Sequence, residues 1–270
     1  MSCALAIGGL DPGGGAGLAA DLRAFAHAGV FGCAAIAVLT IQSTSGLLRA
    51  TPVAPRDLLA QAREVLRHQR VRAMKVGALG SAANVRAVAS LLAANHGVPA
   101  VVDTPMLPSR GTGRLLAERA EGALRTALIP RAALVTVNVP EAERLLGARV
   151  LGVRDAREAA LALCRMGARA ALVKGGHLPD EASGLAIDTL AIGRDVIVLR
   201  AKRLTLPPTH GTGCTLASLI AGRLAARAAW SLRTGSTELV LAVRWAKRAH
   251  HAALSRARDV GGTARVLAFV

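Results

Sequence analysis

Short apolar runs rich in Val, Ile and Leu alternate along this 270-residue chain with longer segments of helical pattern. Runs of the first kind are typical of strands in a parallel sheet, and the longer pattern is typical of helices that cover such a sheet. We expect strands near residues 4–8, 34–40, 73–76, 100–103, 134–136 and 170–174, and helices near 17–28, 56–70, 82–95, 113–128, 140–146 and 155–167. The alternation predicts an α/β fold whose central, mostly parallel sheet has helices on both faces.

The last third of the chain departs from that alternation. Two alternating runs within residues 184–199 flank the turn Gly193–Arg194, which predicts a β-hairpin. A glycine turn at Gly211 and two long helices follow. Because no polar linker and no internal repeat interrupts the chain, we expect residues 1–270 to form a single domain.

The charge of the chain changes this picture little. A formal net charge of +17 would suggest a nucleic-acid partner if the basic residues were clustered, but most are arginines scattered singly between Arg23 and Arg265. Aromatic residues make up only 2% of the chain, which leaves little material for stacking on single strands. We therefore expect a solvated basic shell that attracts anionic substrates, and no nucleic-acid partner.

Cysteine usage and the lack of a membrane segment predict a cytoplasmic location. The four cysteines, at positions 3, 33, 164 and 214, fall in no paired metal spacing and favour free thiols in a reducing compartment. Residues 1–10 have no basic leader and run straight into Asp11, unlike a signal peptide. The longest apolar run, residues 31–41, is too short to span a bilayer, so no membrane partner is expected.

Polar and glycine positions follow the carboxyl ends of the predicted strands. They are Asp11–Gly17, Gln42, Gly77, Asp103, Asn138 with Glu141, the segment 174–177, and the Gly211 turn. In an open α/β sheet, ligands bind outside these strand ends, so one cleft could hold a nucleotide, a metal and a small substrate.

The run THGTGCT, residues 209–215, carries the most specific chemistry. Gly211 and Gly213 let backbone amides approach a ligand, and the first turn of the following helix presents unpaired N–H groups. This arrangement predicts an anion site, where the helix dipole would lower the pKa of the Cys214 thiol. A glycine-rich connection with a buried cysteine is the alternative, because short glycine motifs are weak signals.

The loop Asp11–Gly17 is rich in glycine but lacks the GxGxxG spacing, which disfavours a dinucleotide site. Asp21, on the following helix, is either a solvated residue or a substrate contact. Gln42 ends an apolar strand, and its carboxamide could pair with an aminopyrimidine edge or simply cap the strand.

Asn138 and Glu141 lie where a strand meets a helix, with Pro140 in the first turn. Asn138 could cap that helix, or Glu141 could bind magnesium or its waters. No GxxxxGK[ST] loop occurs, so phosphate binding would rely on the Gly211–Gly213 turn and on Lys174. We expect His177 and His210 to form local hydrogen bonds, and Cys3, Cys33 and Cys164 to lie in the core.

Six motifs in order make the chain resemble a known family. They are GGLDPGGGAGLAADLRAF, Gln42 with Ser43-Thr44, VDTPML, TVNVPEAERLL, LVKGGH and HGTGCTLAS. Their order and spacing resemble those of the hydroxymethylpyrimidine/phosphomethylpyrimidine kinases of thiamin biosynthesis, a branch of the ribokinase superfamily. The resemblance covers residues 4 to about 226 and implies a ribokinase-like α/β domain, assembled as a homodimer, that uses ATP and Mg²⁺.

The resemblance also implies roles for individual residues. Ala16, Asp21 and Gln42 would surround the pyrimidine, Asp103 and Glu141 would serve magnesium, and Asn138, Lys174 and Thr212 would bind the ATP phosphates. Gly211 and Gly213 would form the anion hole, and Cys214 would stand in place of the catalytic base. The implied reaction transfers the γ-phosphoryl group of ATP to the hydroxymethyl oxygen, and then a second one to the monophosphate.

Departures from the family pattern gather at the acceptor end. They are Leu10, Gly13, Pro105, Val137, the segment 109–112 and the pair Pro207-Pro208. A pyridoxal/pyridoxine kinase of the same superfamily is therefore an alternative, as is a non-catalytic pyrimidine-binding homologue. Gln42 favours the aminopyrimidine as acceptor.

Overall fold

The computed structural model describes all residues except 104, 107–114, 177, 179–183, 232–233 and 270. In chain order its elements are β1 (Cys3–Leu10), α1 (Gly17–His27), β2 (Phe31–Ser43), β3 (Gly46–Pro52), α2 (Pro55–His68), β4 (Val71–Val76), α3 (Ala82–Ala94), β5 (Ala100–Asp103), η1 (Glu118–Ala120), α4 (Glu121–Ala123), η2 (Leu124–Leu128), η3 (Ile129–Arg131), β6 (Leu134–Asn138), α5 (Val139–Leu146), α6 (Val153–Arg165), β7 (Ala170–Lys174), β8 (Leu185–Ile192), β9 (Asp195–Lys202), β10 (Thr209–His210), α7 (Thr212–Arg227), α8 (Gly235–Ser255) and β11 (Arg265–Val266). The six predicted parallel strands and the hairpin are confirmed.

The strands of the described residues form one large sheet in the order β3-β2-β1-β4-β5-β6-β7-β8-β9. Strands β2, β1, β4, β5, β6 and β7 run parallel, while β3, β8 and β9 are antiparallel to their neighbours. A right-handed crossover through a helix is the usual link between parallel strands, which explains the βα alternation of the sequence. The α/β fold with a mostly parallel sheet is therefore confirmed.

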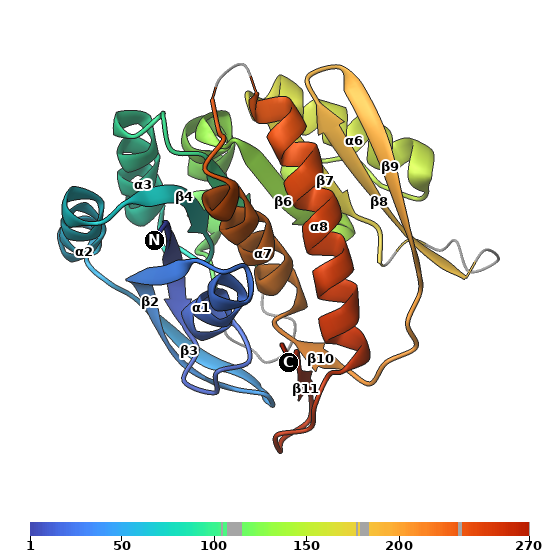
Figure 1. Ribbon diagram of the computed structural model, residues 1–270, viewed down its shortest axis with the longest axis horizontal. Coiled ribbons are helices and arrows are strands. Elements are labelled where there is room, and N and C mark those ends of the chain that lie inside the picture. Colours follow the sequence, from blue (N-terminus) through green and yellow to red (C-terminus); the bar gives the residue numbers. More distant parts are fainter. Residues whose placement is uncertain (104, 107–114, 177, 179–183, 232–233, 270) are drawn as a thin grey trace.

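Two hydrophobic cores lie on opposite faces of the sheet, under the helices that Figure 1 shows on its two sides. Helices α2, α3, α5 and α6 bury their apolar residues on one face, and α1, α7 and α8 bury theirs on the other. Helix α7 is covered by α1 and α8, and residues 215–222 are all buried. Close packing of α7 on α1 depends on Gly222, where a Cβ atom would lie 2.8 Å from the Cβ of Ala28.

Three elements differ from the prediction. The expected helix 113–128 is, in its described part, a series of short helical turns from η1 to η3. Helix α7 begins at Thr212 rather than at Leu216, where the apolar pattern starts, because glycine and polar residues fill its first turn. Strand β3 was not predicted; it pairs with β2 through the short turn after Ser43, and Leu39, Ile41 and Leu48 remain exposed on this hairpin.

A separate two-stranded sheet joins segments that are distant in sequence. Strand β10 pairs in parallel with β11, so that Thr209 lies opposite Arg265 and His210 lies opposite Val266. Thr44 holds the same C-terminal segment, because its hydroxyl donates a hydrogen bond of 2.8 Å to the carbonyl of Gly261. The segment therefore fixes the position of His210 immediately before α7.

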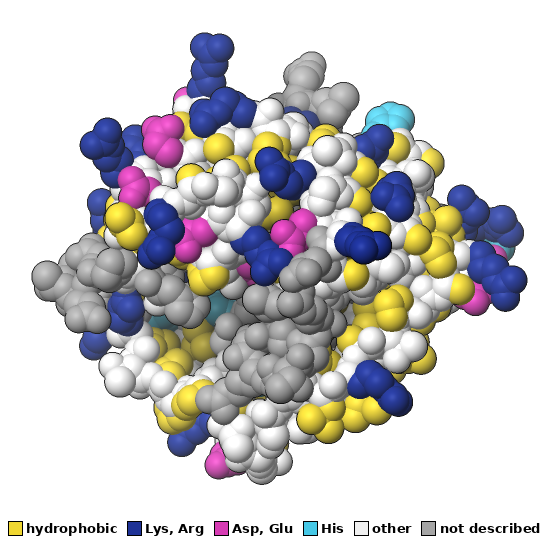
Figure 2. All heavy atoms as spheres, turned by 180° about the vertical axis from the view of Figure 1, so that it is seen from behind, with side chains coloured by type: hydrophobic (Ala, Val, Ile, Leu, Met, Phe, Trp, Pro, Cys, Tyr) yellow, Lys and Arg dark blue, Asp and Glu magenta, His cyan; other side chains and the backbone are white. Residues whose placement is uncertain are grey.

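None of the described helices combines the length and the apolarity that a bilayer crossing requires. Basic side chains are spread over the face seen in Figure 2 and interspersed with acidic and apolar ones.

Candidate active site

The bend before α7 is built on a backbone contact between two glycine loops. Gly211 adopts a left-handed conformation with φ of 77°, and a Cβ atom there would lie 2.0 Å from the carbonyl oxygen of Gly15. Only glycine permits both the conformation and this approach. The contact places the amides of the first α7 turn, from Thr212 to Cys214, beside the loop that follows β1, and these N–H groups have no intrahelical partner.

Lys174 and Asp103 lie directly over this turn. A Cβ atom on Gly213 would be 3.2 Å from Nζ of Lys174 and 3.8 Å from Oδ2 of Asp103. Lys174 donates to Oδ1 of Asp103 at 3.1 Å, and Thr136 donates to the same oxygen at 2.8 Å. Burial alone would raise the pKa of Asp103, but Lys174 and Lys75 outweigh it and hold this pKa below its usual value. Asp103 is therefore a carboxylate held beside unpaired amides.

Asn138 and Glu141 form a capping box at the start of α5. The Asn138 side chain accepts the Glu141 N–H at 2.8 Å, and the Glu141 carboxylate accepts the Asn138 N–H at 2.8 Å. The capping function suggested by the sequence is thus observed. Burial raises the pKa of Glu141 to about 7, helped by the negative charge of Asp103 and opposed by Lys174. A positive ligand near these carboxylates would lower that pKa and stabilise the charged form.

The Cys214 thiol differs from its sequence-based prediction. Burial raises the pKa of Cys214 to about 11. The nearby Lys75 opposes this rise, whereas the negative charges of Asp103 and Asp21 add to it. The expected lowering of this pKa by the helix N-terminus is therefore wrong, because burial of the thiol disfavours its charged form. At neutral pH the thiol is protonated.

Asp21 is fully buried, so its interpretation as a solvated residue is wrong. Both of its carboxylate oxygens accept hydrogen bonds from Nζ of Lys75, at 3.0 and 2.9 Å, and the Ser218 hydroxyl donates to Oδ1 at 2.6 Å. Contact of Asp21 with a substrate stays a prediction, and these partners occupy both oxygens here. The triad joins α1, β4 and α7 directly beneath the site.

Sequence reasoning missed Lys75. Its signal was a charged residue at the end of a central strand, between Met74 and Val76, where both faces of the sheet are covered. Lysine is almost never fully buried without a partner, so this position predicts a carboxylate nearby.

A second cluster of predicted site residues is organised around Asp11. Its side chain accepts the N–H groups of Gly13, at 2.9 Å, and of Ala16, at 2.8 Å, and contacts Nε2 of His210 at 3.0 Å. Gln42 reaches the same His210 nitrogen at 3.1 Å. His210 therefore bonds across the fold rather than locally, and Gln42 lies within β2 rather than capping it.

Helix α8 holds the turn at Thr212 and the turn at Gly175. His250 donates from Nε2 to the Thr212 carbonyl at 2.9 Å. One turn earlier, Lys247 donates to Oδ2 of Asp188 at 2.5 Å, while the N–H of Gly175 donates to Oδ1 of Asp188 at 2.9 Å. The helix thus fixes the Gly175 turn and the Thr212 turn relative to each other.

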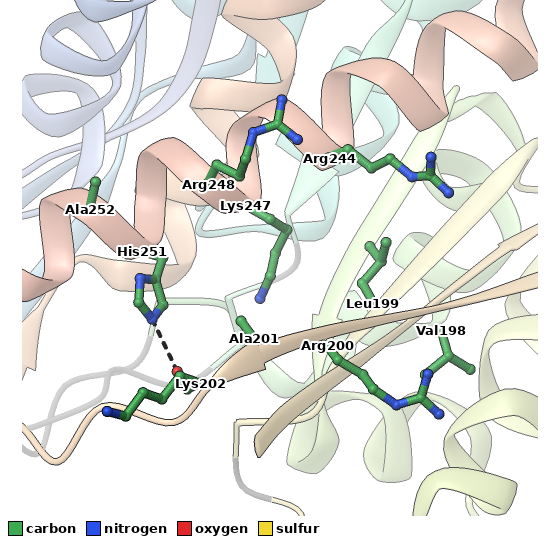
Figure 3. A pocket seen from close by; sticks show the side chains of 10 residues that line it. All are labelled: Val198, Leu199, Arg200, Ala201, Lys202, Arg244, Lys247, Arg248, His251 and Ala252. Atoms are coloured by element: carbon green, nitrogen blue, oxygen red, sulfur yellow. Dashed lines mark hydrogen bonds between the residues drawn. The ribbon is translucent and has the colours of Figure 1, made fainter. Parts of the chain in front are cut away.

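A basic groove separates α8 from β9 (Figure 3). This cavity of about 490 Å³ is lined by Arg200, Lys202, Arg244, Lys247, Arg248 and His251 together with apolar residues. Its charge makes the surroundings of α8 attractive to anionic ligands.

The structure thus gathers the predicted residues in two groups. Gly211, Thr212, Gly213, Cys214, Lys174 and Asp103 meet at the first turn of α7, with the Asn138–Glu141 capping box electrostatically coupled to them. Ala16 and Gln42 are linked to the Asp11–His210 pair at the acceptor end. The predicted core cysteines Cys3 and Cys33 are buried, and Cys164 is half-buried. His177 and the segment 109–112 lie outside the described residues.

Comparison with known proteins finds a family model and relatives that are similar to this chain in sequence. Residues 11–267 match the family model described as phosphomethylpyrimidine kinase. A hydroxymethylpyrimidine/phosphomethylpyrimidine kinase from Streptomyces coelicolor is 42% identical over 221 residues, covering 82% of this chain and 80% of that protein. The corresponding kinase from Haemophilus influenzae is 38% identical over 223 residues, covering 82% of each.

Solved structures share the fold. An ADP complex of Bacillus subtilis pyridoxal kinase superposes with a TM-score of 0.85 at 27% identity, covering 99% of this chain and 96% of that chain. A phosphomethylpyrimidine kinase from Clostridium difficile 630 gives a TM-score of 0.75 at 28% identity, covering 92% of this chain and 99% of that chain. The pyrimidine kinases of the sequence comparison share more sequence with this chain than the pyridoxal kinase does, whereas fold similarity does not separate the two activities.

Replacing Lys75 tests the buried ion pair. We expect Lys75→Met to lower the free energy of unfolding in urea by ~3–5 kcal/mol, because it leaves the Asp21 charge buried without a partner. Arg67→Met, in the exposed pair of Arg67 with Glu64, should cost less than ~1 kcal/mol. The double variant Asp21→Leu/Lys75→Met should recover part of the loss. Equal costs for Lys75→Met and Arg67→Met would contradict this account.

His250 should make stability depend on pH. Burial lowers the pKa of His250 to about 4, from 6.5 in the unfolded chain, so between these values the unfolded state binds more protons. Stability therefore falls as pH drops from ~6.5 to ~4, by up to about 3 kcal/mol. We expect His250→Gln to remove this part of the pH dependence in urea titrations, while His68→Gln, at an exposed position of α2, leaves it unchanged. An unaltered profile for His250→Gln would rule out the effect.

Proposed function

The chain belongs to the phosphomethylpyrimidine kinase family, and we propose that it transfers the γ-phosphoryl group of ATP to hydroxymethylpyrimidine and then to its monophosphate, as in thiamin biosynthesis. The observation that carries the proposal is the amide-lined turn at Gly211–Cys214, with Lys174 and Asp103 beside it. Fixed donors of this kind stabilise the charge that spreads over a phosphoryl group in transfer.

At the phosphate end, each residue has a distinct task. The amides of Gly211, Thr212 and Gly213 surround the transferring group, and Lys174 and Asn138 contact the nucleotide phosphates. ATP as the donor is supported by the ADP complex of the B. subtilis relative. The hydrogen bond from His250 to the Thr212 carbonyl holds the peptide that links Thr212 to Gly213, and Gly213 lies beside Lys174 and Asp103.

Asp103 and Glu141 fit a magnesium ion. Among the described residues, nothing donates a hydrogen bond to Oδ2 of Asp103 or to Oε1 of Glu141, so each carboxylate keeps one oxygen for a ligand. One or two carboxylates together with substrate phosphates are the usual protein environment of Mg²⁺. When bound, the ion would neutralise negative charge on the phosphates.

At the acceptor end, Ala16 and Gln42 contact the pyrimidine, and Asp21 supports the site through Lys75 and Ser218. The acceptor oxygen forms a bond to the γ-phosphorus while the bond from that phosphorus to ADP breaks, and the hydroxyl proton leaves for a base. We assign this base to Cys214. Because its thiol is protonated at neutral pH, only a small thiolate fraction acts, and the amides and charges contribute most of the rate.

An assay with two acceptors tests the proposed function. The fold is shared with a pyridoxal kinase, so the purified protein should be offered ATP, Mg²⁺ and either hydroxymethylpyrimidine or pyridoxal in a coupled ADP assay. We expect hydroxymethylpyrimidine to be the better substrate by at least ~10-fold in kcat/KM, since a site that hydrogen-bonds one ring leaves polar groups unpaired with the other. Turnover of pyridoxal alone would overturn the assignment.

The role of Cys214 predicts a specific pH profile. If its thiolate is the base, kcat of the unmodified protein should rise by up to ~10-fold per pH unit between pH 7 and 9, below the thiol pKa of about 11. Cys214→Ala should lower kcat by ~10²-fold or more and flatten this rise, with KM for ATP changed little. Unchanged turnover in Cys214→Ala would remove the base role from this residue.

We further propose a homodimer formed through the β2–β3 hairpin. Leu39, Ile41 and Leu48 are 49%, 46% and 73% exposed on this hairpin, and neighbouring apolar side chains at this level of exposure favour burial against a second copy. The four free cysteines support a reducing, cytoplasmic location for the assembly.

A charge on the hairpin should dissociate this dimer. Leu48→Glu is expected to halve the mass measured by sedimentation equilibrium, because it buries a carboxylate in an apolar contact. Leu151→Glu, at a residue that is 62% exposed outside the hairpin, is the matched control and should leave the mass unchanged. A monomeric unmodified protein would refute the dimer.

A further inference from the structure

One nitrogen atom, Nε2 of His210, faces two side chains at once. It lies 3.0 Å from Oδ2 of Asp11 and 3.1 Å from the carboxamide of Gln42. A single ring nitrogen either carries a proton and donates, or lacks one and accepts. If one of the two partners can only accept a hydrogen bond, Nε2 must be a donor, and the atom of the other partner that faces it must be an acceptor as well.

Asp11 is the fixed partner. Its two oxygens already accept the N–H groups of Gly13 and Ala16, an arrangement that only an acceptor can satisfy at both positions. Burial would raise the pKa of Asp11, but the bonds from His210 and from the two backbone amides together lower it, so the group is ionised. A carboxylate has no proton to give, and Nε2 of His210 must therefore be the donor. A neutral imidazole meets this requirement as its Nε2–H tautomer, and a doubly protonated one meets it because both ring nitrogens then carry a hydrogen.

The donor at Nε2 constrains Gln42. With the amide nitrogen of Gln42 turned toward it, two N–H donors would face each other at 3.1 Å without an acceptor between them. A rotation of 180° exchanges the oxygen and nitrogen of a carboxamide without moving anything else, and the choice between them follows from the hydrogen-bond network. With the oxygen toward His210, one N–H serves both the Asp11 carboxylate and the Gln42 carbonyl.

We infer that the Asp11–His210 pair is a positioning device that turns the oxygen of Gln42 toward His210 and its NH₂ group toward the acceptor ring. The inference rests on the proposed function, because it takes Gln42 as the residue that meets the ring. It defines the acceptor class more narrowly: the edge read by Gln42 must present a hydrogen-bond acceptor, such as a ring nitrogen lone pair, rather than an amino group.

The imidazole of His210 has little room to move away from Asp11 and Gln42. A Cβ atom on Gly15 would lie 2.5 Å from Cδ2 of His210 and 3.1 Å from a methyl group of Val266, so the ring fills the space that this glycine leaves. The backbone of His210 is paired with Val266 in the small sheet. The orientation of Gln42 is thus fixed from residues far away in sequence.

Two acceptor analogues distinguish the orientations. In one, hydrogen replaces the amino group of hydroxymethylpyrimidine; in the other, C–H replaces the ring nitrogen beside the amino carbon. With the NH₂ group toward the ring, kcat/KM should fall by at least ~10-fold for the second analogue and by less than ~3-fold for the first, because only the second leaves buried donors unpaired. A large loss for the first analogue alone would overturn the inference while leaving the proposed function intact. Failure of the unmodified protein to phosphorylate the parent compound would overturn both.

Variants of His210 test the device itself. His210→Met removes the N–H while keeping the side-chain length, so Gln42 can adopt either orientation and the ratio of kcat/KM between the two analogues should approach ~1. His210→Gln restores a donor near the former Nε2 position and should recover most of the discrimination. KM for ATP should stay the same in both variants, a result that general damage to the site would not give. Unchanged discrimination in His210→Met would refute the positioning role.

Discussion

The close approach of two backbone segments, the bend at Gly211 and the loop at Gly15, is the constraint on which the site depends. The carbonyl oxygen of Gly15 occupies the space of a side chain on Gly211, so the two loops are in direct backbone contact. On one side of this contact lie the amides of the first α7 turn, and on the other lies Ala16, held by Asp11. The two groups of predicted site residues are thereby built on one shared piece of backbone.

Pairing of positive and negative side chains around the first turn of α7 is the second constraint on the site. The buried Lys75 and the half-buried Lys174 are each paired with an aspartate, Asp21 and Asp103 respectively. Burial raises the pKa values of Cys214 and Glu141, and the positive charges of Lys75 and Lys174, respectively, limit that rise. The turn at Gly211–Cys214 is thus surrounded by paired charges rather than by a simple positive pocket, and under the proposed function these would be preorganised partners for the phosphates.

The sequence predicted best those features that depend on local properties of a few neighbouring residues. Apolar runs predicted the parallel strands, and the glycines of THGTGCT predicted the bend, because the periodicity and the backbone freedom are local properties. Strand β3 was missed because its pairing with β2 leaves it half-exposed and without a clear apolar run. The Cys214 pKa was predicted with the wrong sign, since the helix dipole is visible in the sequence but burial by distant segments is not. Lys75 and the Asp11–His210–Gln42 contact depend on which strands become neighbours, which periodicity does not encode.

The parallel pairing of β10 with β11 has a consequence for how the protein is made. His210 is held by residues that are translated more than fifty positions later, so a nascent chain can pair the strands of the large sheet before Val266 is available to pair with His210. The placement of His210 is therefore the last of these backbone pairings that synthesis can complete.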